Sequence, residues 1–292
     1  MIVASKRERF GYYLFLLPAF IIFGTFIFGP MIYSFYLSFC KYSLVTATSA
    51  KWIGLDNYLN LFKNMQFLAA VKNTAIFTVI LVPLTLFGGL MVAIGINSKL
   101  IKYKRFYKIC YYIPYVSSMV AVSYVFKILF SGRPDGVMNA LLQSIGLEPI
   151  GWLASADWAL IVVILLSFWK QVGYVMIIYL GGLLAIPDDV YEAVSLDPIS
   201  GTTMLRKITL PLLKPTTMFL LVTEVINSFQ IFTPVHVMTS GGPGMATLTL
   251  VTLLYEKGFK NSEMGQASAI AVIIFVVLLI LSIIQNKVDS KE

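Results

Sequence analysis

The chain has 292 residues, of which 58% are hydrophobic and only 12% are charged, and its mean hydropathy is +0.84. A soluble domain typically has about 25% charged residues. This composition therefore excludes a soluble enzyme with an ordinary polar surface, and it also excludes intrinsic disorder. The excess of 22 basic over 14 acidic residues gives a net charge of +8. The basic residues lie mostly in segments between apolar runs, which is typical of a protein embedded in membrane lipid and does not indicate nucleic-acid binding.

Six apolar runs follow one another along the chain, and each is long enough to cross a bilayer, which requires about 20 residues per helix. The runs cover approximately residues 10–39, 74–97, 106–130, 158–186, 216–238 and 266–284. We expect each run to be an α-helix, because a helix satisfies its own backbone polar groups in lipid. The sequence therefore predicts an all-α polytopic membrane protein with six transmembrane helices, forming a single transmembrane domain over residues 1–292.

The basic residues are distributed unequally between the two sides of this topology. Thirteen lie on or next to the side that holds both termini: Lys6, Arg7, Arg9, Lys99, Lys102, Lys104, Arg105, Lys108, Arg206, Lys207, Lys214, Lys287 and Lys291. Seven lie on the other side: Lys41, Lys51, Lys63, Lys72, Arg133, Lys257 and Lys260. Because Lys and Arg are enriched in cytoplasmic loops, both termini are predicted to be cytoplasmic.

Residues suited to covalent or metal chemistry are scarce. The two cysteines, Cys40 and Cys110, are far apart without a metal-binding spacing, and His236 is the single histidine of the sequence. The sequence also has no GxxxxGK[ST] phosphate-binding motif. We therefore expect no catalytic residues, no metal site and no cofactor in this chain.

The connection between the fourth and fifth runs, residues 187–215, is long, charged and bounded by prolines. Asp188 and Asp189 follow Pro187, which is a favourable start for a helix. The pattern predicts two short helices with a bend near residues 198–201. A membrane protein that receives force from a soluble partner needs such an element, because a short helix lying across the membrane face can act as a lever.

This connection resembles the EAA motif of binding-protein-dependent ABC import permeases, EAAxxDGAxxxxxFxxIxLPxxxP. The matching residues are Glu192, Ala193, Asp197, Ile208, Leu210, Pro211 and Pro215. Leu205 replaces the aromatic residue of the motif, and Pro198 and Ile199 replace its Gly-Ala pair. The resemblance implies that this segment couples the permease to an ATPase through Glu192, Ala193, Asp197, Pro198, Gly201, Leu210 and Pro211.

Three further stretches are similar to the carbohydrate-uptake branch of this family, which includes maltose and glycerol-phosphate type permeases. They are residues 52–58, residues 113–117 with Gly136, Asn139 and Leu142 beyond them, and residues 237–247 followed by 254–259. The resemblance implies a MetI-like permease core that transports a sugar or sugar derivative by alternating access. It also implies a cytoplasmic ABC ATPase dimer that binds ATP and Mg²⁺, a second permease subunit forming a heterodimer, and an extracytoplasmic solute-binding protein.

Polar residues inside the spans are candidates for the transport pathway, because ionisable groups in lipid are costly unless paired or hydrated. In the fifth run, Glu224, Asn227 and Gln230 share one arc of a helix drawn at 100° per residue. This arc indicates either a solute pathway or hydrogen bonding between helices in a dry bundle. Lys170, in the fourth run, is the fourth candidate, because it could pair with Glu224 or face a solute hydroxyl. It could equally extend to the membrane interface, as we expect for Lys127.

Two other classes of protein compete with the ABC permease. In a secondary transporter driven by an ion gradient, Glu224 and Lys170 would belong to a proton relay, but such a protein would show an internal repeat, and the sequence shows none. A membrane-embedded enzyme would need a convergent set of His, Cys or carboxylate residues in the spans.

Overall fold

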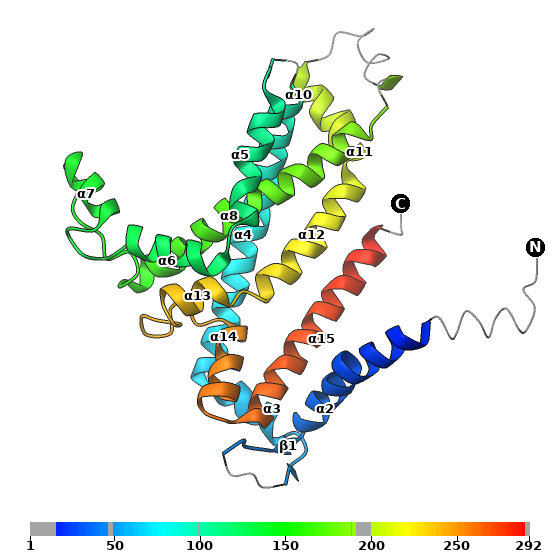
Figure 1. Ribbon diagram of the computed structural model, residues 1–292, viewed down its shortest axis with the longest axis vertical. Helices are drawn as coiled ribbons and strands as arrows, with labels where there is room; N and C mark the ends of the chain where they lie inside the picture. The colour runs from blue at the N-terminus through cyan, green and yellow to red at the C-terminus, as the bar shows by residue number, and fades with distance from the viewer. Residues whose placement is uncertain (1–15, 46–48, 99, 188, 191–199, 290–292) are drawn as a thin grey trace, which may run out of the picture. The chain divides into compact units, whose positions relative to one another are not determined.

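The computed structural model describes residues 16–45, 49–98, 100–187, 189–190 and 200–289, most of which are helical (Figure 1). The chain divides into two compact units, Met1–Lys63 with Leu254–Ile273, and Asn64–Leu253 with Ile274–Glu292. Helix α15 (Met264–Asp289) contributes to both units. The single domain expected over residues 1–292 stays a prediction.

The first unit begins with an apolar helix over Leu16–Leu37, which contains the π-helical turn η1 (Gly24–Phe28) and α2 (Gly29–Leu37). Almost all of its side chains are exposed, as expected for a helix that faces lipid or another subunit. A two-stranded antiparallel hairpin follows, formed by β1 (Cys40–Lys41) and β2 (Lys51–Trp52), with Cys40 opposite Trp52. The unit is completed by α3 (Asp56–Lys63), the π-helical turn η3 (Glu256–Lys260) and the start of α15.

Asn57 fixes α3 to the end of the first span. Its Nδ2 donates hydrogen bonds to the carbonyl oxygens of Ser38, at 2.8 Å, and Cys40, at 2.9 Å. This gives a structural reason for the signature at residues 52–58, because the amide satisfies carbonyls beyond the end of a helix.

The core of the second unit is formed by three long helices, α4 (Met65–Asn97), α8 (Ala156–Leu184) and α12 (Lys214–Phe229). Buried apolar side chains of α4, α8 and α12, with Leu213 just before α12, form one cluster: Leu90, Ala93, Ile96, Val175, Met176, Tyr179, Leu180, Leu183, Leu213 and Leu220. Small residues let α4 approach α8 closely, since a Cβ built on Gly89 would lie 2.5 Å from Cγ1 of Val175.

Most of the predicted spans are present with shifted ends. The second run begins earlier than predicted, at Met65, where the Asn64 side chain caps the helix by accepting the Gln66 N–H. The fourth and sixth runs correspond to α8 and α15, while residues 10–15 of the first run lie outside the described residues.

The third run is not the straight helix that its composition suggests. It consists of α5 (Lys104–Val116) and α6 (Met119–Leu129), which meet at an angle of 92°. Pro114 lies in the last turn of α5, and Ser118 begins α6 by accepting the Ala121 N–H. Among the described residues five helices are long and apolar enough to cross a membrane, and the count reaches six when this bent pair is one span.

The fifth run is also interrupted. Helix α12 ends at Phe229, and α13 (Thr233–Met238) begins after three residues. Helix α13 packs along α6, so the outer segments of the two broken runs lie side by side (Figure 1). Helix α7 (Val137–Ser144) follows α6, and α14 (Leu250–Tyr255) follows the loop after α13.

The connection after α8 is helical where it is described. Helix α10 (Gly201–Met204), the π-helical turn η2 (Leu205–Thr209) and α11 (Leu210–Leu212) form one helical segment, which we call the coupling segment. Ser200 caps it by accepting the Thr203 N–H at 3.3 Å. The single residue Leu213, fully buried in the apolar cluster, joins it to α12. The bend expected near residues 198–201 falls mostly outside the described residues.

Candidate transport pathway and coupling segment

Glu224 is buried in the second unit with an exposed fraction of 1%. It lies one turn from Leu220, in the apolar cluster, and one turn from Ser228, whose Oγ donates to Thr78 Oγ1 of α4 at 2.9 Å. Neither carboxylate oxygen has a hydrogen-bond partner among the described residues. Burying a carboxylate without donors costs free energy, so Glu224 remains a candidate for a functional residue.

The three residues that the sequence placed on one arc differ in exposure, although the Asn227 side chain lies close enough to the Glu224 carboxyl group to interact with it. Asn227 and Gln230 are exposed, whereas Glu224 faces the core. Gln230 is the C-cap of α12 and not part of the helix. The projection assumed that α12 continues past Phe229, where the helix ends; the assignment of Glu224, Asn227 and Gln230 to the solute pathway stays a prediction.

Lys170 has a different environment from the ones predicted. Its exposed fraction is 6%, and its Nζ donates to three backbone carbonyl oxygens: Pro114 at 3.0 Å, Tyr115 at 2.9 Å and Ser117 at 2.6 Å. An ammonium group has three donors, so all are used at the break between α5 and α6. Lys170 therefore neither extends to the membrane interface nor pairs with Glu224 in the described part of the chain.

Lys127 lies near the end of α6 and also binds a carbonyl. Its Nζ donates to the Val237 oxygen of α13 at 3.0 Å, while the side chain remains partly exposed. Lys127 therefore bridges α6 and α13, and its extension toward the membrane interface stays a prediction.

Two residues near Lys170 were missed by the sequence analysis. Tyr115 stacks on Tyr174 with ring centroids 4.8 Å apart, and it lies close enough to Glu224 for an electrostatic interaction. Gln171 has a buried Oε1 without a partner among the described residues. Gln171 follows Lys170 directly, so a search for polar residues inside the spans could have found it.

The family-like stretches after the third and fifth runs organise loops of the second unit. Asn139 donates to the carbonyls of Arg133 and Ile150, and its Oδ1 accepts from Ile150 N and Trp152 Nε1, all at 2.9–3.0 Å. In the loop after α13, Gly241 and Gly244 have φ values of +87° and +53°, which favour glycine. These motifs therefore fix loop conformation.

The same loop is held by side chains of α4. Asn73 Nδ2 donates to the carbonyls of Met245 at 2.7 Å and Leu248 at 3.0 Å, and Thr74 Oγ1 accepts the Leu250 N–H. The loop and the beginning of α4 are thereby tied together.

Of the predicted coupling residues, Glu192, Ala193, Asp197 and Pro198 lie outside the described residues. Gly201 begins α10, and Leu210 and Pro211 lie exposed on α11.

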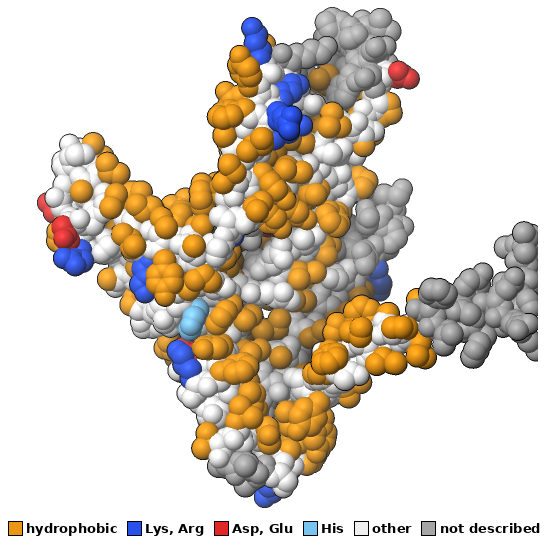
Figure 2. All heavy atoms as spheres, in the orientation of Figure 1, with side chains coloured by type: hydrophobic (Ala, Val, Ile, Leu, Met, Phe, Trp, Pro, Cys, Tyr) orange, Lys and Arg blue, Asp and Glu red, His pale blue; other side chains and the backbone are white. Residues whose placement is uncertain are grey.

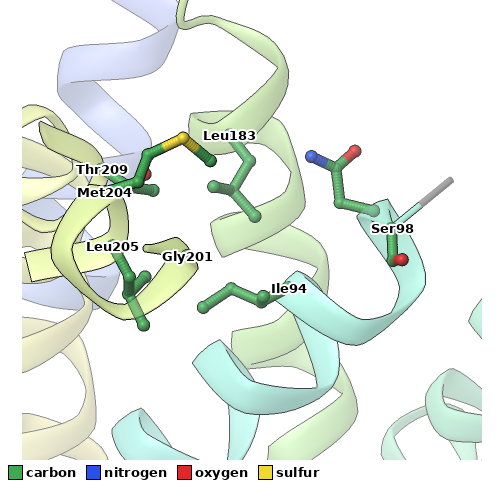
Figure 3. A pocket seen from close by; sticks show the side chains of 8 residues that line it. Ile94, Ser98, Leu183, Gly201, Met204, Leu205 and Thr209 are labelled. Carbon is green, nitrogen blue, oxygen red and sulfur yellow. The ribbon is translucent and has the colours of Figure 1, made fainter. Parts of the chain in front are cut away.

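Figure 3 shows a pocket of about 310 Å³ where the coupling segment faces the ends of α4 and α8. Its lining residues are Ile94, Asn97, Ser98, Leu183, Gly201, Met204, Leu205 and Thr209. The coupling segment is thus not tightly packed against α4 and α8 here, while Leu213 anchors its other end.

The chain is similar to known membrane transport proteins over nearly its whole length. It is 34% identical to the probable ABC transporter permease protein YurN of Bacillus subtilis, over 94% of each chain. It is also 34% identical to the lactose transport system permease protein LacF of Rhizobium radiobacter, over 98% of this chain and 97% of LacF.

A solved structure has the same fold. A chain of the crystal structure of a bacterial ABC transporter involved in the import of the acidic polysaccharide alginate matches with a TM-score of 0.83 and 25% identity, covering 98% of this chain and 96% of that one. The family model described as the binding-protein-dependent transport system inner membrane component matches residues 85–291. The chain therefore belongs to this family of inner membrane components of binding-protein-dependent transport systems.

Proposed function

We propose that this chain is the transmembrane permease subunit of an ATP-driven ABC importer for a sugar or sugar derivative. The observation that carries the proposal is the continuous path from the coupling segment through Leu213 into α12, the helix that contains Glu224. A displacement of the coupling segment is transmitted directly to the span with the buried carboxylate. The names of LacF and of the alginate importer support a carbohydrate as the solute.

ATP hydrolysis is assigned to separate cytoplasmic ATPase subunits, which form a dimer and bind ATP and Mg²⁺. The absence of a phosphate-binding motif from the sequence supports this division. Residues 189–200, which precede the coupling segment in the chain, dock on the ATPase, with Glu192 and Ala193 in the contact. Lys and Arg side chains gather at the end of the second unit where α5 begins (Figure 2), and this supports a cytoplasmic location for that end. The excess of basic residues on the side of the termini in the sequence supports a cytoplasmic location for both of them.

The solute pathway uses the polar residues of the fifth span. Asn227 and Gln230 are exposed and available to solute or to the companion permease, and Glu224 becomes accessible when α12 moves. A carboxylate accepts hydrogen bonds from hydroxyl groups, which suits a sugar. An extracytoplasmic binding protein delivers the solute, and a second, different permease completes the pathway.

Uptake by proteoliposomes containing the assembled importer tests the transport function. Uptake is expected to require ATP on the ATPase side and to persist when ionophores abolish ion gradients. Glu224→Gln is expected to reduce uptake at least tenfold while the complex stays assembled, whereas the matched change Glu148→Gln, at an exposed residue, leaves uptake unchanged. Uptake driven by an ion gradient without ATP would contradict the proposal and identify a secondary transporter.

Co-purification of the ATPase tests the coupling assignment. Glu192→Lys and Ala193→Trp are expected to release the ATPase while the permease stays in the membrane, because each disturbs the contact by charge or by size. The charge reversal Glu148→Lys is the control. Full ATPase binding and full solute-stimulated hydrolysis in both variants would exclude this segment as the coupling element.

A further inference from the structure

The break in the third span poses a hydrogen-bonding problem. In an uninterrupted helix, the carbonyl oxygens of residues 114, 115 and 117 would accept the N–H groups four residues later. The bend of 92° between α5 and α6 removes these partners, and only the Pro114 carbonyl has a local substitute among the described residues, the Ser117 Oγ, which donates to it at 2.6 Å. In lipid, each unsatisfied backbone group costs several kcal/mol, so a break of this kind persists only with donors from elsewhere.

Lys170 supplies these donors. The carbonyl oxygens of Pro114, Tyr115 and Ser117 each accept a hydrogen bond from its Nζ at 2.6–3.0 Å. A positive charge is also favourable at the C-terminal end of a helix, and α5 ends at Val116. The ammonium thus replaces the hydrogen bonds that a straight helix would make.

We propose that Lys170 is a positioning residue for transport, which holds α6 at its angle to α5. Its ammonium has no donor left for solute. Its influence therefore runs through the backbone of residues 114–117, which also places Tyr115 near Glu224.

The angle of α6 matters because α6 carries other contacts. It packs along α13 (Figure 1). Lys127 bridges the two helices through the Val237 carbonyl. Helix α13 is joined to α12 by three residues. Holding α6 therefore also holds the end of the span that contains Glu224. The effect of these contacts on transport rests on the proposed function, whereas the effect of Lys170 on the angle between α5 and α6 does not.

The bend is measured by the distance between spin labels on α5 and α6. We would label Phe106→Cys and Ile128→Cys, both exposed, after replacing exposed Cys110 by Ser and keeping buried Cys40. A helix rise of 1.5 Å per residue gives about 23 Å between these Cα atoms for a bend near 90° and about 33 Å for a straight helix.

Lys170→Met keeps the length of the side chain but removes its donors. The expected result is a shift of the distance distribution toward the longer value with a loss of uptake. Lys72→Met, at an exposed residue of α4, is expected to change neither. An unchanged distance in Lys170→Met would overturn the proposal, and a loss of uptake with an unchanged distance would assign Lys170 to solute contact instead.

A second variant keeps the test decisive if Lys170→Met does not assemble. Lys170→Ala lacks the three carbons and the ammonium that n-propylammonium contains. This ion is expected to restore assembly and the shorter distance, whereas tetramethylammonium, which has no N–H donor, is not. Failure of n-propylammonium to restore either property would overturn the proposal. The distance between the spin labels is measured without transport. The role of Lys170 in holding the bend can therefore be confirmed even if the proposed sugar-import function is wrong.

Discussion

The breaks in the third and fifth spans solve the same problem with different donors. At the first break, a buried ammonium binds three carbonyl oxygens of the backbone. At the second, a neutral hydroxyl takes part, since Thr249 Oγ1 donates to the Ile231 carbonyl at 3.2 Å. Hydrogen bonds to charged groups contribute more than neutral ones, so the first break is expected to be held more strongly.

The two buried ionisable side chains near the breaks, Lys170 and Glu224, differ in how many hydrogen-bond partners they have. Lys170 is saturated by its own chain, whereas Glu224 has two carboxylate oxygens without a partner among the described residues. A saturated charge serves the fold, and an unsatisfied one is available for a ligand or for a partner in another conformation. Burial alone therefore does not identify a transport residue, but burial together with hydrogen-bond satisfaction separates the two.

The largest expected effect on stability is that of Lys170→Met. The change removes the donor that three carbonyls share, of which only that of Pro114 keeps another, the Ser117 hydroxyl, and we expect a loss of about 3 kcal/mol in the free energy of unfolding. Thermal unfolding of the purified permease measures it. A loss of free energy of unfolding smaller than the contribution of one neutral hydrogen bond, about 1 kcal/mol, would show that the break does not depend on the ammonium.

The next effect concerns the approach of α5 to α8, which brings the carbonyls within reach of Lys170. A Cβ on Gly173 would clash with the Tyr111 carbonyl oxygen, whereas a Cβ on Gly181, in the same helix, meets nothing within 4 Å. Gly173→Ala is expected to cost about 1–3 kcal/mol, whereas Gly181→Ala is expected to be neutral or to stabilise by up to about 1 kcal/mol, because Ala has the higher helix propensity. Equal unfolding temperatures for these variants would contradict the packing of α5 on α8.

Glu224→Leu has an expected effect of the opposite sign. Removing a buried carboxylate that lacks donors is expected to stabilise the permease by about 1–3 kcal/mol while abolishing uptake. Thermal unfolding and uptake are measured on the same preparation. Destabilisation would show that Glu224 has partners like those of Lys170, and the contrast between the two residues would be lost.

The smallest expected effect is that of Thr249→Val at the second break. Loss of the neutral hydroxyl donor is expected to cost about 1 kcal/mol. Comparison with Lys170→Met then measures how much more the charged donor contributes. A cost equal to that of Lys170→Met would remove the distinction between the breaks.

The sequence by itself determined the class and environment of this protein. Among the described residues, five helical spans lie where apolar runs predicted them when α12 and α13 are counted as one, because the length of a run and the absence of charge are local properties that suffice for insertion into lipid. The EAA-like motif and the stretches around Asn139 and residues 237–247 were likewise readable, because their residues are close together in the chain. The family assignment from these motifs agrees with the match over residues 85–291.

Tertiary structure decided the break between α5 and α6, the role of Lys170 and the burial of Glu224 next to the exposed Asn227 and Gln230. Composition does not reveal a break, because its carbonyls are satisfied by a side chain more than 50 residues away in the sequence. A helical projection places side chains around one axis, but it gives neither the residue where the helix ends nor the face that its neighbours cover. Both depend on which donors and apolar surfaces other helices bring to the same place, and that is a property of the folded chain.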